Sequence, residues 1–375
     1  MNGKPIRVLV VAGGTGGHIV PGIALAGEFQ HKGHSVHFLT LERNRNFGDF
    51  QHVDFPVQHY AAPPLRRSVL SLAAFPYRTV RAIMRARKLL RSLRIELMVG
   101  MGGYPVLPAI LAARMLGVPY YLCEQNAIPG KITRRFGAGA RRVYINLPLA
   151  ENQNGKKPRL TIAEDRIVLA GNPLRARILE ALQSRTKSNK QPGADGLKRI
   201  LVLGGSQGAT QINSMVMRLI PELRAQNVRW YFQCGERNVD ALRADLSEED
   251  AGQVELFGYR SDVNRLFLNS DVLIGRAGAG VISEAACFGL PMILIPYPFA
   301  ADNHQLANAR AFERAGAAVI IDRKDTDVTE LRAALQKFVR RPETFREMQK
   351  AALSMGHPDA AQIIVRSIVD DFTSL

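Results

Sequence analysis

The sequence contains few cysteines and no clustered metal ligands. Cys123, Cys234 and Cys287 are the only three among 375 residues, and their scattered positions match neither a disulfide framework nor a zinc site. We therefore expect buried thiols in a reducing compartment. No group of histidines, cysteines and carboxylates has the spacing of metal ligands, so we expect the protein to work without a metal ion.

Long apolar runs are missing as well. No uncharged apolar stretch approaches the roughly 20 residues of a membrane-spanning helix. The apolar stretch at residues 6–12 is too short, and wrongly flanked, for a signal peptide. A hydrophobic content of 46% and a charged content of 22% are ordinary for a soluble globular protein, and this length favours two domains. These features predict a soluble, cytoplasmic chain.

Acidic residues are absent between Phe55 and Ile95, although basic residues are abundant there. The whole chain has a formal net charge of +17, and residues 1–150 hold 20 basic against 6 acidic residues. Basic and apolar residues alternate in this interval, which indicates a surface for anionic lipid or, less often, for nucleic acid. The alternative is a core-facing helix with a solvated basic face. The nine basic residues are Arg66, Arg67, Arg78, Arg81, Arg85, Arg87, Lys88, Arg91 and Arg94.

Strand-like and helix-like patterns alternate along the chain, which indicates parallel sheets with crossover helices. In the first half the predicted helices span 19–32, 82–93 and 107–116, and the predicted strands span 6–12, 36–41, 97–99 and 119–123. In the second half the predicted strands span 199–203, 228–234, 254–257, 272–274, 292–295 and 318–321. Residues 184–198 are polar and interrupted by Pro192 and Gly193, so we predict a surface loop or a linker there.

Two strands run directly into glycine-rich turns that open helices. The turns are GGTGGH at 13–18 and GGSQGA at 204–209, and their first glycines lie 191 positions apart, about one domain length. Glycine lets the backbone approach a ligand, and a helix N-terminus attracts phosphate. Since open parallel sheets bind ligands at the carboxyl ends of their strands, we expect loops 13–18, 100–105, 124–126, 204–209 and 275–284 to line one inter-domain cleft.

Several candidate residues have two interpretations each. The first turn has Ile19 where a dinucleotide fingerprint has its third glycine, yet Glu42 is placed to contact a ribose, so a dinucleotide stays possible on this segment. His18 is placed either as a general base or as a polar cap. Glu284 is placed either to bind ribose hydroxyls or to complement the helix dipole. Residues 302–309 suit either helix capping or sugar binding.

Seven of these segments resemble one family when taken together. They are GGTGGH at 13–18, GMGGY at 100–104, EQN at 124–126, GNPLR at 171–175, GGSQGA at 204–209, RAGA at 276–279 with SE at 283–284, and DNHQLANA at 302–309. The chain is similar, over nearly its whole length, to the bacterial MurG family of UDP-N-acetylglucosamine:lipid I N-acetylglucosaminyltransferases. The resemblance implies an α/β chain of GT-B fold, with two Rossmann-like domains facing each other across a deep cleft. Residues 1–175 with 358–375 would bind lipid I and the membrane, and residues 176–357 would bind UDP-GlcNAc.

The resemblance also implies residue roles. His18 would be the general base of an inverting transfer to the muramyl 4-hydroxyl, and the Arg260 loop would meet uracil through its backbone. The implied donor-binding residues are Thr15, Gly16, Gly17, Asn126, Arg175, Ser206, Arg260, Ala279, Gly280, Val281, Ile282, Ser283, Glu284 and Gln305. The acceptor pyrophosphate would meet Gly13, Gly14, Gly102 and Gly103. The membrane face would comprise Arg66, Arg67, Leu70, Leu72, Phe75, Arg78, Arg81 and Arg85.

The implied product is lipid II, made for peptidoglycan and so for cell shape, division and the cell cycle. The protein would sit peripherally on the cytoplasmic face of the bacterial inner membrane, use no cofactor, and meet cell-wall and division proteins but no nucleic acid. Four places depart from the family pattern: Cys123, the pair Asn303–His304, the loop 259–262, and the loop 184–198, which is longer and more basic than expected. Competing functions are another sugar-nucleotide enzyme such as a UDP-GlcNAc 2-epimerase, a dinucleotide oxidoreductase and a membrane adaptor.

Overall fold

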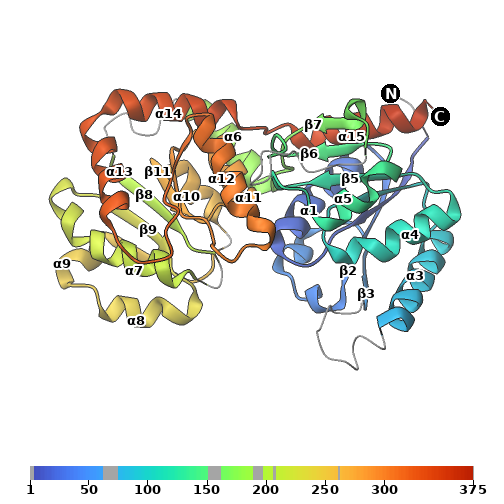
Figure 1. Cartoon of the computed structure of the whole chain (residues 1–375), viewed down its shortest axis with the longest axis horizontal. Helices are drawn as coiled ribbons and strands as arrows, with labels where there is room; N and C mark the ends of the chain where they lie inside the picture. Colours follow the sequence, from blue (N-terminus) through green and yellow to red (C-terminus); the bar gives the residue numbers. More distant parts are fainter. Residues whose placement is uncertain are drawn as a thin grey trace. The chain divides into compact units, whose positions relative to one another are not determined.

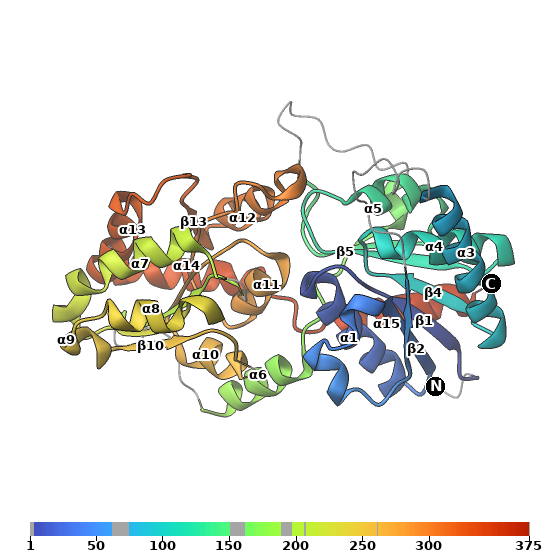
Figure 2. The ribbon, with the colours of Figure 1, turned by 90° about the horizontal axis from the view of Figure 1, so that it is seen from below.

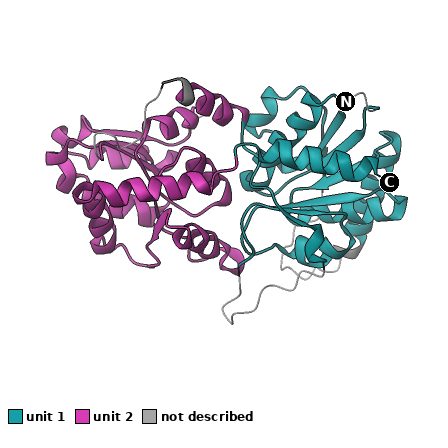
Figure 3. Cartoon of the chain, turned by 90° about the horizontal axis from the view of Figure 1, so that it is seen from above, with its two compact units in different colours: residues 1–175, 358–375 teal, residues 176–357 magenta. Residues whose placement is uncertain are grey.

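The computed structural model describes residues 4–61, 75–150, 162–188, 197–205, 208–260 and 262–374. The chain divides into two compact units (Figure 3). Unit 1 comprises residues 1–175 together with 358–375, and unit 2 comprises residues 176–357. The last segment of the chain therefore belongs to the same unit as its first half. None of the described helices is both long and apolar enough to cross a membrane.

Unit 1 is built on a seven-stranded parallel sheet. Its strands are β1 (Arg7–Val11), β2 (Ser35–Leu41), β3 (Val57–Tyr60), β4 (Leu97–Gly100), β5 (Tyr120–Glu124), β6 (Val143–Ile145) and β7 (Ile167–Leu169). They lie in the order β3-β2-β1-β4-β5-β6-β7, and each neighbouring pair is parallel. The order therefore reverses between β1 and β4, which is the point where such sheets bind ligands.

Helices cover both faces of this sheet (Figures 1 and 2). They are α1 (Gly16–His31), α3 (Phe75–Ser92), α4 (Leu107–Leu116), α5 (Lys131–Phe136) and α15 (Ala360–Thr373). Successive side chains of β1 alternate between the faces, as the pleat requires. Val8 and Val10 pack with α1 and α15, whereas Leu9 and Val11 pack with α3 and α4. Both faces are apolar because both are covered.

Unit 2 repeats this architecture with a six-stranded parallel sheet in the order β10-β9-β8-β11-β12-β13. The strands are β8 (Arg199–Leu203), β9 (Arg229–Gln233), β10 (Val254–Phe257), β11 (Val272–Gly275), β12 (Met292–Leu294) and β13 (Ala318–Ile320). The helices are α6 (Ala176–Ser188), α7 (Thr210–Leu219), α8 (Val239–Ala244), α9 (Glu248–Ala251), α10 (Val263–Asn269), α11 (Ala279–Cys287), α12 (His304–Arg314), α13 (Thr329–Arg340) and α14 (Pro342–Ser354). Here the order reverses between β8 and β11.

Large buried side chains fill the core of unit 2. Trp230 and Phe232 on β9 are fully buried and pack in one cluster with apolar residues of α7, α13 and α14. Phe267 on α10 stacks on Phe288, which follows α11, with ring centroids 5.7 Å apart. These contacts hold α10 and α11 in place, and α11 carries several of the predicted donor-binding residues.

The predicted parallel sheets with crossover helices are confirmed in both units. The helix 107–116 and the strands 199–203 and 254–257 have the predicted bounds. The prediction of a loop over 184–198 is wrong for its first part, because α6 continues to Ser188. Polar residues there extend a helix whose apolar face, at Ile178 and Ala181, is already buried. The helix predicted at 82–93 begins earlier, at Phe75.

Candidate active site

The glycine loops that follow β1 and β4 lie against each other at the reversal point of the first sheet. Gly14, Gly102 and Gly103 have φ angles of +102°, +89° and +77°, a region that favours glycine. A Cβ atom added to Gly103 would stand 3.1 Å from the backbone oxygen of Gly13. The two loops therefore approach too closely for side chains. All four glycines predicted to meet the acceptor pyrophosphate come together here.

His18 lies on the first turn of α1, where Thr15 occupies the N-cap position. Its ring is half-buried, and its Nδ1 atom lies 2.7 Å from Oε1 of Gln125. A Cβ atom on Gly102 would stand 3.2 Å from Cε1 of the same ring. The imidazole is therefore held between the loops that follow β4 and β5. Thr15 and Gly17 are exposed beside it.

A buried carboxylate organises the loop that follows β5. Glu124, only 3% exposed, accepts hydrogen bonds at Oε2 from the Gly130 amide (2.8 Å) and the Thr133 hydroxyl (2.7 Å). Its Oε1 accepts from the Asn126 amide at 3.2 Å. The buried carboxylate thus finds three donors in the segment that follows it, as a buried charged group requires. It also fixes the loop position of Asn126, a predicted donor-binding residue.

The corresponding edge of unit 2 carries the second glycine loop and the start of α11. Gly205 and Gly208 have φ angles of +89° and +75°, and a Cβ atom on Gly208 would collide with the backbone oxygen of Cys234. Ser206, predicted to contact the diphosphate, lies outside the described residues. Gly208 is therefore required for packing as well as for turning.

The helix α11 presents its N-terminus at the end of β11. Gly278 is its N-cap, and its first turn contains no acidic residue. The first N–H groups of a helix have no partner within it, and they carry partial positive charge. Asn308 on α12 donates to the Ala277 oxygen at 3.1 Å and so fixes the turn before the helix. Ser283 and Glu284 lie one turn on, both buried.

Ala279, Gly280, Val281 and Ile282 form the first turn of α11. Ile282 is fully buried in the core, so any ligand contact it makes comes from its backbone. All four are among the predicted donor-binding residues.

Arg276 fastens the loop that follows β12 to the turn before α11. Its guanidinium is half-buried and donates to the backbone oxygens of Ile295 (2.9 Å) and Pro296 (3.1 Å). It also lies over the ring of Tyr297, 5.6 Å from the centroid. Burial lowers the pKa of Arg276 from its ordinary value. Gln305, predicted to bind the sugar, accepts a hydrogen bond from the Tyr297 amide at 2.9 Å.

The start of α12 contains a tight turn. Asp302 and Asn303 both adopt left-handed backbone angles, with φ of +52° and +53°. Asp and Asn tolerate this region better than other residues with side chains. Nδ1 of His304 lies 2.7 Å from the Ala301 oxygen. The pair Asn303–His304, which departs from the family pattern, therefore serves the turn that places Gln305.

Arg260 and Arg175 are two further predicted donor contacts. The Arg260 guanidinium pairs with Asp262 at 2.7 Å and with Glu255, and it lies over the Phe257 ring. Hydrogen bonding to Arg260 outweighs burial and lowers the pKa of Asp262. Because this side chain is engaged within unit 2, a contact with uracil would come from the backbone, as the resemblance implies. Arg175 is half-buried at the last position of the first segment of unit 1.

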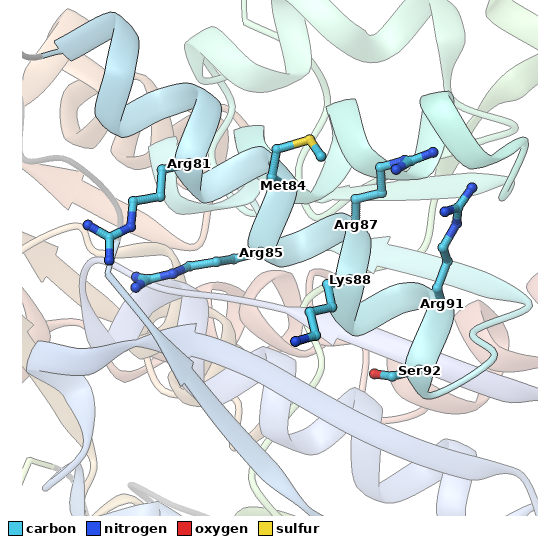
Figure 4. Close-up of a pocket in the computed structure, with 7 residues that line it drawn as sticks. All are labelled: Arg81, Met84, Arg85, Arg87, Lys88, Arg91 and Ser92. Atoms are coloured by element: carbon cyan, nitrogen blue, oxygen red, sulfur yellow. The ribbon is translucent and has the colours of Figure 1, made fainter.

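The helix α3 carries the described part of the predicted membrane face (Figure 4). One side, at Ala82, Ala86 and Leu90, is buried in the core beside α4. The outer side exposes Tyr77, Val80 and Met84, which are 69%, 58% and 47% exposed. Arg78, Arg81, Arg85 and Lys88 are exposed around this apolar stripe. Phe75 opens the helix, whereas Arg66, Arg67, Leu70 and Leu72 lie outside the described residues.

Some residues of this site were missed in the sequence analysis. Gln125 and Glu124 belong to the EQN motif, which was used for Asn126 alone, and Arg276 belongs to RAGA. Their positions at the carboxyl ends of the buried strands β5 and β11 were a usable signal. Within the described ranges, no three His, Cys, Asp or Glu side chains are grouped to hold a metal ion.

Comparison with known proteins assigns both halves of the chain to domains of one glycosyltransferase family. Residues 8–145 match the glycosyltransferase family 28 N-terminal domain, and residues 199–364 match the glycosyltransferase family 28 C-terminal domain. Relatives named UDP-N-acetylglucosamine–N-acetylmuramyl-(pentapeptide) pyrophosphoryl-undecaprenol N-acetylglucosamine transferase are found in Leptospira interrogans and Pseudomonas syringae. They are 36% and 33% identical, covering 95% and 97% of this chain and 96% and 98% of theirs.

Solved structures agree with this placement. The crystal structure of Acinetobacter baumannii MurG has a TM-score of 0.76 and 26% identity, covering 98% of this chain and 100% of its own. A UDP-GlcNAc 2-epimerase from Neisseria meningitidis has a TM-score of 0.67 at 14% identity, with 97% of this chain and 100% of its own covered, and so shares the fold. The predicted GT-B fold is confirmed. The chain belongs to the MurG family of N-acetylglucosamine transferases, within glycosyltransferase family 28.

Proposed function

We propose that this chain transfers N-acetylglucosamine from UDP-GlcNAc to the muramyl 4-hydroxyl of lipid I and so makes lipid II. The relatives' names specify this donor sugar and an undecaprenyl-pyrophosphoryl muramyl acceptor. The observation that carries the proposal is the placement of His18, on a helix N-terminus at the sheet reversal, with Gln125 on Nδ1. That placement suits a base working beside a phosphorylated acceptor.

In the proposed reaction, His18 takes the proton of the 4-hydroxyl while its oxygen attacks the anomeric carbon of GlcNAc. The new C–O bond forms as the bond from the anomeric carbon to UDP breaks, and the configuration inverts. General base catalysis of this kind contributes about 10²–10⁴-fold to the rate. The glycines at 13, 14, 102 and 103 would receive the acceptor pyrophosphate through backbone N–H groups.

Unit 2 would bind the donor. The N–H groups at the start of α11 would meet the negative charge that gathers on departing UDP, and Arg175, which belongs to unit 1, is proposed to contact the same diphosphate. Glu284 would accept hydrogen bonds from both ribose hydroxyls, and Gln305 would bind the hydroxyls of GlcNAc. With these groups assigned to charge stabilisation, we expect transfer to continue when divalent cations are chelated.

The same proposal places the chain peripherally on the cytoplasmic face of the bacterial inner membrane. The support is α3, whose exposed apolar stripe at Tyr77, Val80 and Met84 is flanked by basic residues. Each basic residue near an anionic bilayer contributes about 1 kcal/mol of attraction. Lipid I is held in that membrane by its undecaprenyl chain, so α3 would keep unit 1 near its substrate. Cell-wall and division proteins are proposed as further partners.

The test is transfer of radiolabelled GlcNAc from UDP-GlcNAc to a lipid I analogue with EDTA present. Labelled disaccharide-lipid from the native chain, with loss of turnover but near-native UDP-GlcNAc affinity in His18→Ala, supports the proposal. Epimerised UDP-sugar formed without acceptor would establish the epimerase alternative instead. A folded chain that binds UDP-GlcNAc but labels no lipid would overturn the proposed acceptor.

A further inference from the structure

We propose that Gln125 is a positioning residue that sets the tautomer of His18, with the proton on Nδ1 and the lone pair on Nε2. This inference rests on the proposed role of His18 as the general base. Its starting observation is the 2.7 Å contact between His18 Nδ1 and Gln125 Oε1. The two residues are 107 positions apart and come from neighbouring loops of one sheet edge.

The orientation of the Gln125 amide follows from its second contact. Its Nε2 donates to the backbone oxygen of Cys123 at 3.3 Å. A carbonyl oxygen only accepts hydrogen bonds, so the NH₂ group must face Cys123. The amide oxygen is then the atom that faces His18, and flipping the amide would set two oxygens against each other.

The protonation state of the ring follows in turn. An amide oxygen also only accepts, so the partner nitrogen, Nδ1, has to donate. In a neutral imidazole the other nitrogen, Nε2, then holds the lone pair. Nε2 is thereby left to take the proton of an attacking hydroxyl. As His18 becomes positively charged, the same oxygen stabilises the Nδ1–H group.

The side chain of Gln125, which accepts the hydrogen bond from His18, is held in place. Gln125 is only 3% exposed, and its backbone oxygen accepts a hydrogen bond from the Asn146 amide at 2.9 Å. Gly102 lies against the same edge of the ring, since a Cβ there would lie 3.2 Å from Cε1, 3.3 Å from Nδ1 and 3.7 Å from Gln125 Oε1. The ring and the amide therefore have little freedom to rearrange.

The groups facing His18 from the neighbouring loops are uncharged. They are the backbones of Gly102 and Gly103 and the amide of Gln125. The nearby Glu124 carboxylate is turned to Gly130 and Thr133. The neutral amide oxygen of Gln125 thus fixes the tautomer of His18, without the negative charge of a carboxylate, which would favour the imidazolium.

Two variants test this role. Gln125→Met keeps the length of the side chain and removes both the acceptor and the donor to Cys123, whereas Gln125→Glu loses the same donor, keeps an acceptor and adds a charge. We expect Gln125→Met to lower kcat for GlcNAc transfer about 10- to 100-fold, with KM for UDP-GlcNAc little changed. This loss is smaller than the loss expected when the base itself is removed. We expect Gln125→Glu to recover most of this activity and to move the acid limb of the kcat–pH profile to higher pH, since its carboxylate favours imidazolium.

A spectroscopic readout separates this inference from the proposed reaction. Nitrogen NMR of ¹⁵N-histidine-labelled protein, with His18→Gln used to assign the signal, should show the Nδ1–H tautomer in the native chain and a mixture in Gln125→Met. The NMR measurement needs no lipid substrate. If it shows the expected tautomer but the chain transfers no GlcNAc, the proposed function is overturned and the positioning role of Gln125 is not. A native ring protonated on Nε2, or equal activity loss in folded Met and Glu variants with no pH shift, would overturn the positioning role.

Discussion

Tyr121 on β5 donates a hydrogen bond to Asp371 on α15, with 2.8 Å between the two oxygens and 250 positions of sequence between the residues. Arg141 and Arg142 donate to the same carboxylate at 3.1 and 3.2 Å. Burial alone would raise the pKa of Asp371, but these three hydrogen bonds outweigh it and lower the pKa. The C-terminal helix is thus tied to the sheet of unit 1 by a charge as well as by apolar packing.

Removing this carboxylate should destabilise unit 1. We expect Asp371→Ala to lower the free energy of unfolding by about 1–3 kcal/mol, because two guanidinium groups and a buried hydroxyl lose their acceptor. Urea unfolding followed by circular dichroism measures this. Asp370→Ala is the matched control, since Asp370 is exposed on the same helix. Equal effects of the two changes would contradict the anchoring role.

The same carboxylate predicts a pH dependence. A folded-state pKa below the unfolded value means that the stabilisation is fully present above about pH 4 and is lost as the pH falls through the folded pKa. The stability gap between the native chain and Asp371→Ala should therefore close in acid. A gap that persists unchanged at low pH would show that packing, not charge, is responsible.

Crowding the ring of His18 should reduce turnover without affecting donor binding. In Gly102→Ala the new methyl group would stand 3.2 Å from His18 Cε1, so the ring must move. We expect kcat to fall about 10- to 100-fold, because small displacements of a catalytic group are costly. UDP affinity should stay near the native value in calorimetry.

A second glycine variant controls for backbone strain in that experiment. Gly117 also has a positive φ, +68°, but a Cβ there would meet nothing within 4 Å. Gly117→Ala should therefore cost stability without affecting kcat. If both variants lose the same activity, the loss comes from strain and not from His18.

Neutralising Glu284 should weaken nucleotide binding. The buried carboxylate lies one turn into α11, and hydrogen bonds to a charged group are worth about 1.5–3 kcal/mol. We expect Glu284→Gln to raise the Kd for UDP by about 10- to 100-fold in titration calorimetry. Glu313→Gln, an exposed change on α12, serves as the control. An unchanged Kd for UDP would show that Glu284 does not bind the ribose.

Neutralising one face of α3 should weaken membrane binding. The triple variant Arg81→Gln, Arg85→Gln and Lys88→Gln removes about 3 kcal/mol of attraction, or about a hundredfold in partitioning. Sedimentation with vesicles containing phosphatidylglycerol measures this, and phosphatidylcholine vesicles should show little binding by either protein.

A charge-matched control distinguishes the helix from net charge. Arg340, Arg346 and Lys350 are exposed on α13 and α14 of unit 2. Changing all three to Gln removes the same charge and should leave vesicle binding nearly unchanged. An equal loss of vesicle binding in the two triple variants would mean that net charge, and not the exposed face of α3, determines membrane binding.

Much of the fold was predictable because its strands are apolar and end in glycine. Strands such as 199–203 and 254–257 have the predicted bounds. The strands β3, β6 and β7 were not predicted. β3 and β7 are the two edge strands of the first sheet and are only partly buried, so each takes its stability from a single neighbouring strand. The residues of α3 before Ala82 were missed because Tyr77 and Val80 there are exposed and do not mark a core-facing side.

The site was predictable where its residues lie in a motif at the end of a strand. His18 and the four glycines of the first unit come together as their positions at strand ends predicted. Gln125 was not singled out, because its contact with His18 joins residues 107 positions apart and depends on how two loops meet. Pairings of that kind are set by tertiary packing, which local patterns do not contain.

The route of the chain has a consequence for synthesis on the ribosome. Unit 2 is one uninterrupted stretch, 176–357, whereas unit 1 includes the final segment, 358–375. Ile364 and Ile368 on that segment share a core with Leu25 and Phe29 of α1. Domains generally fold as units in the order in which they emerge. Here the half that is translated first is the last to complete its core, because that core waits for the final helix.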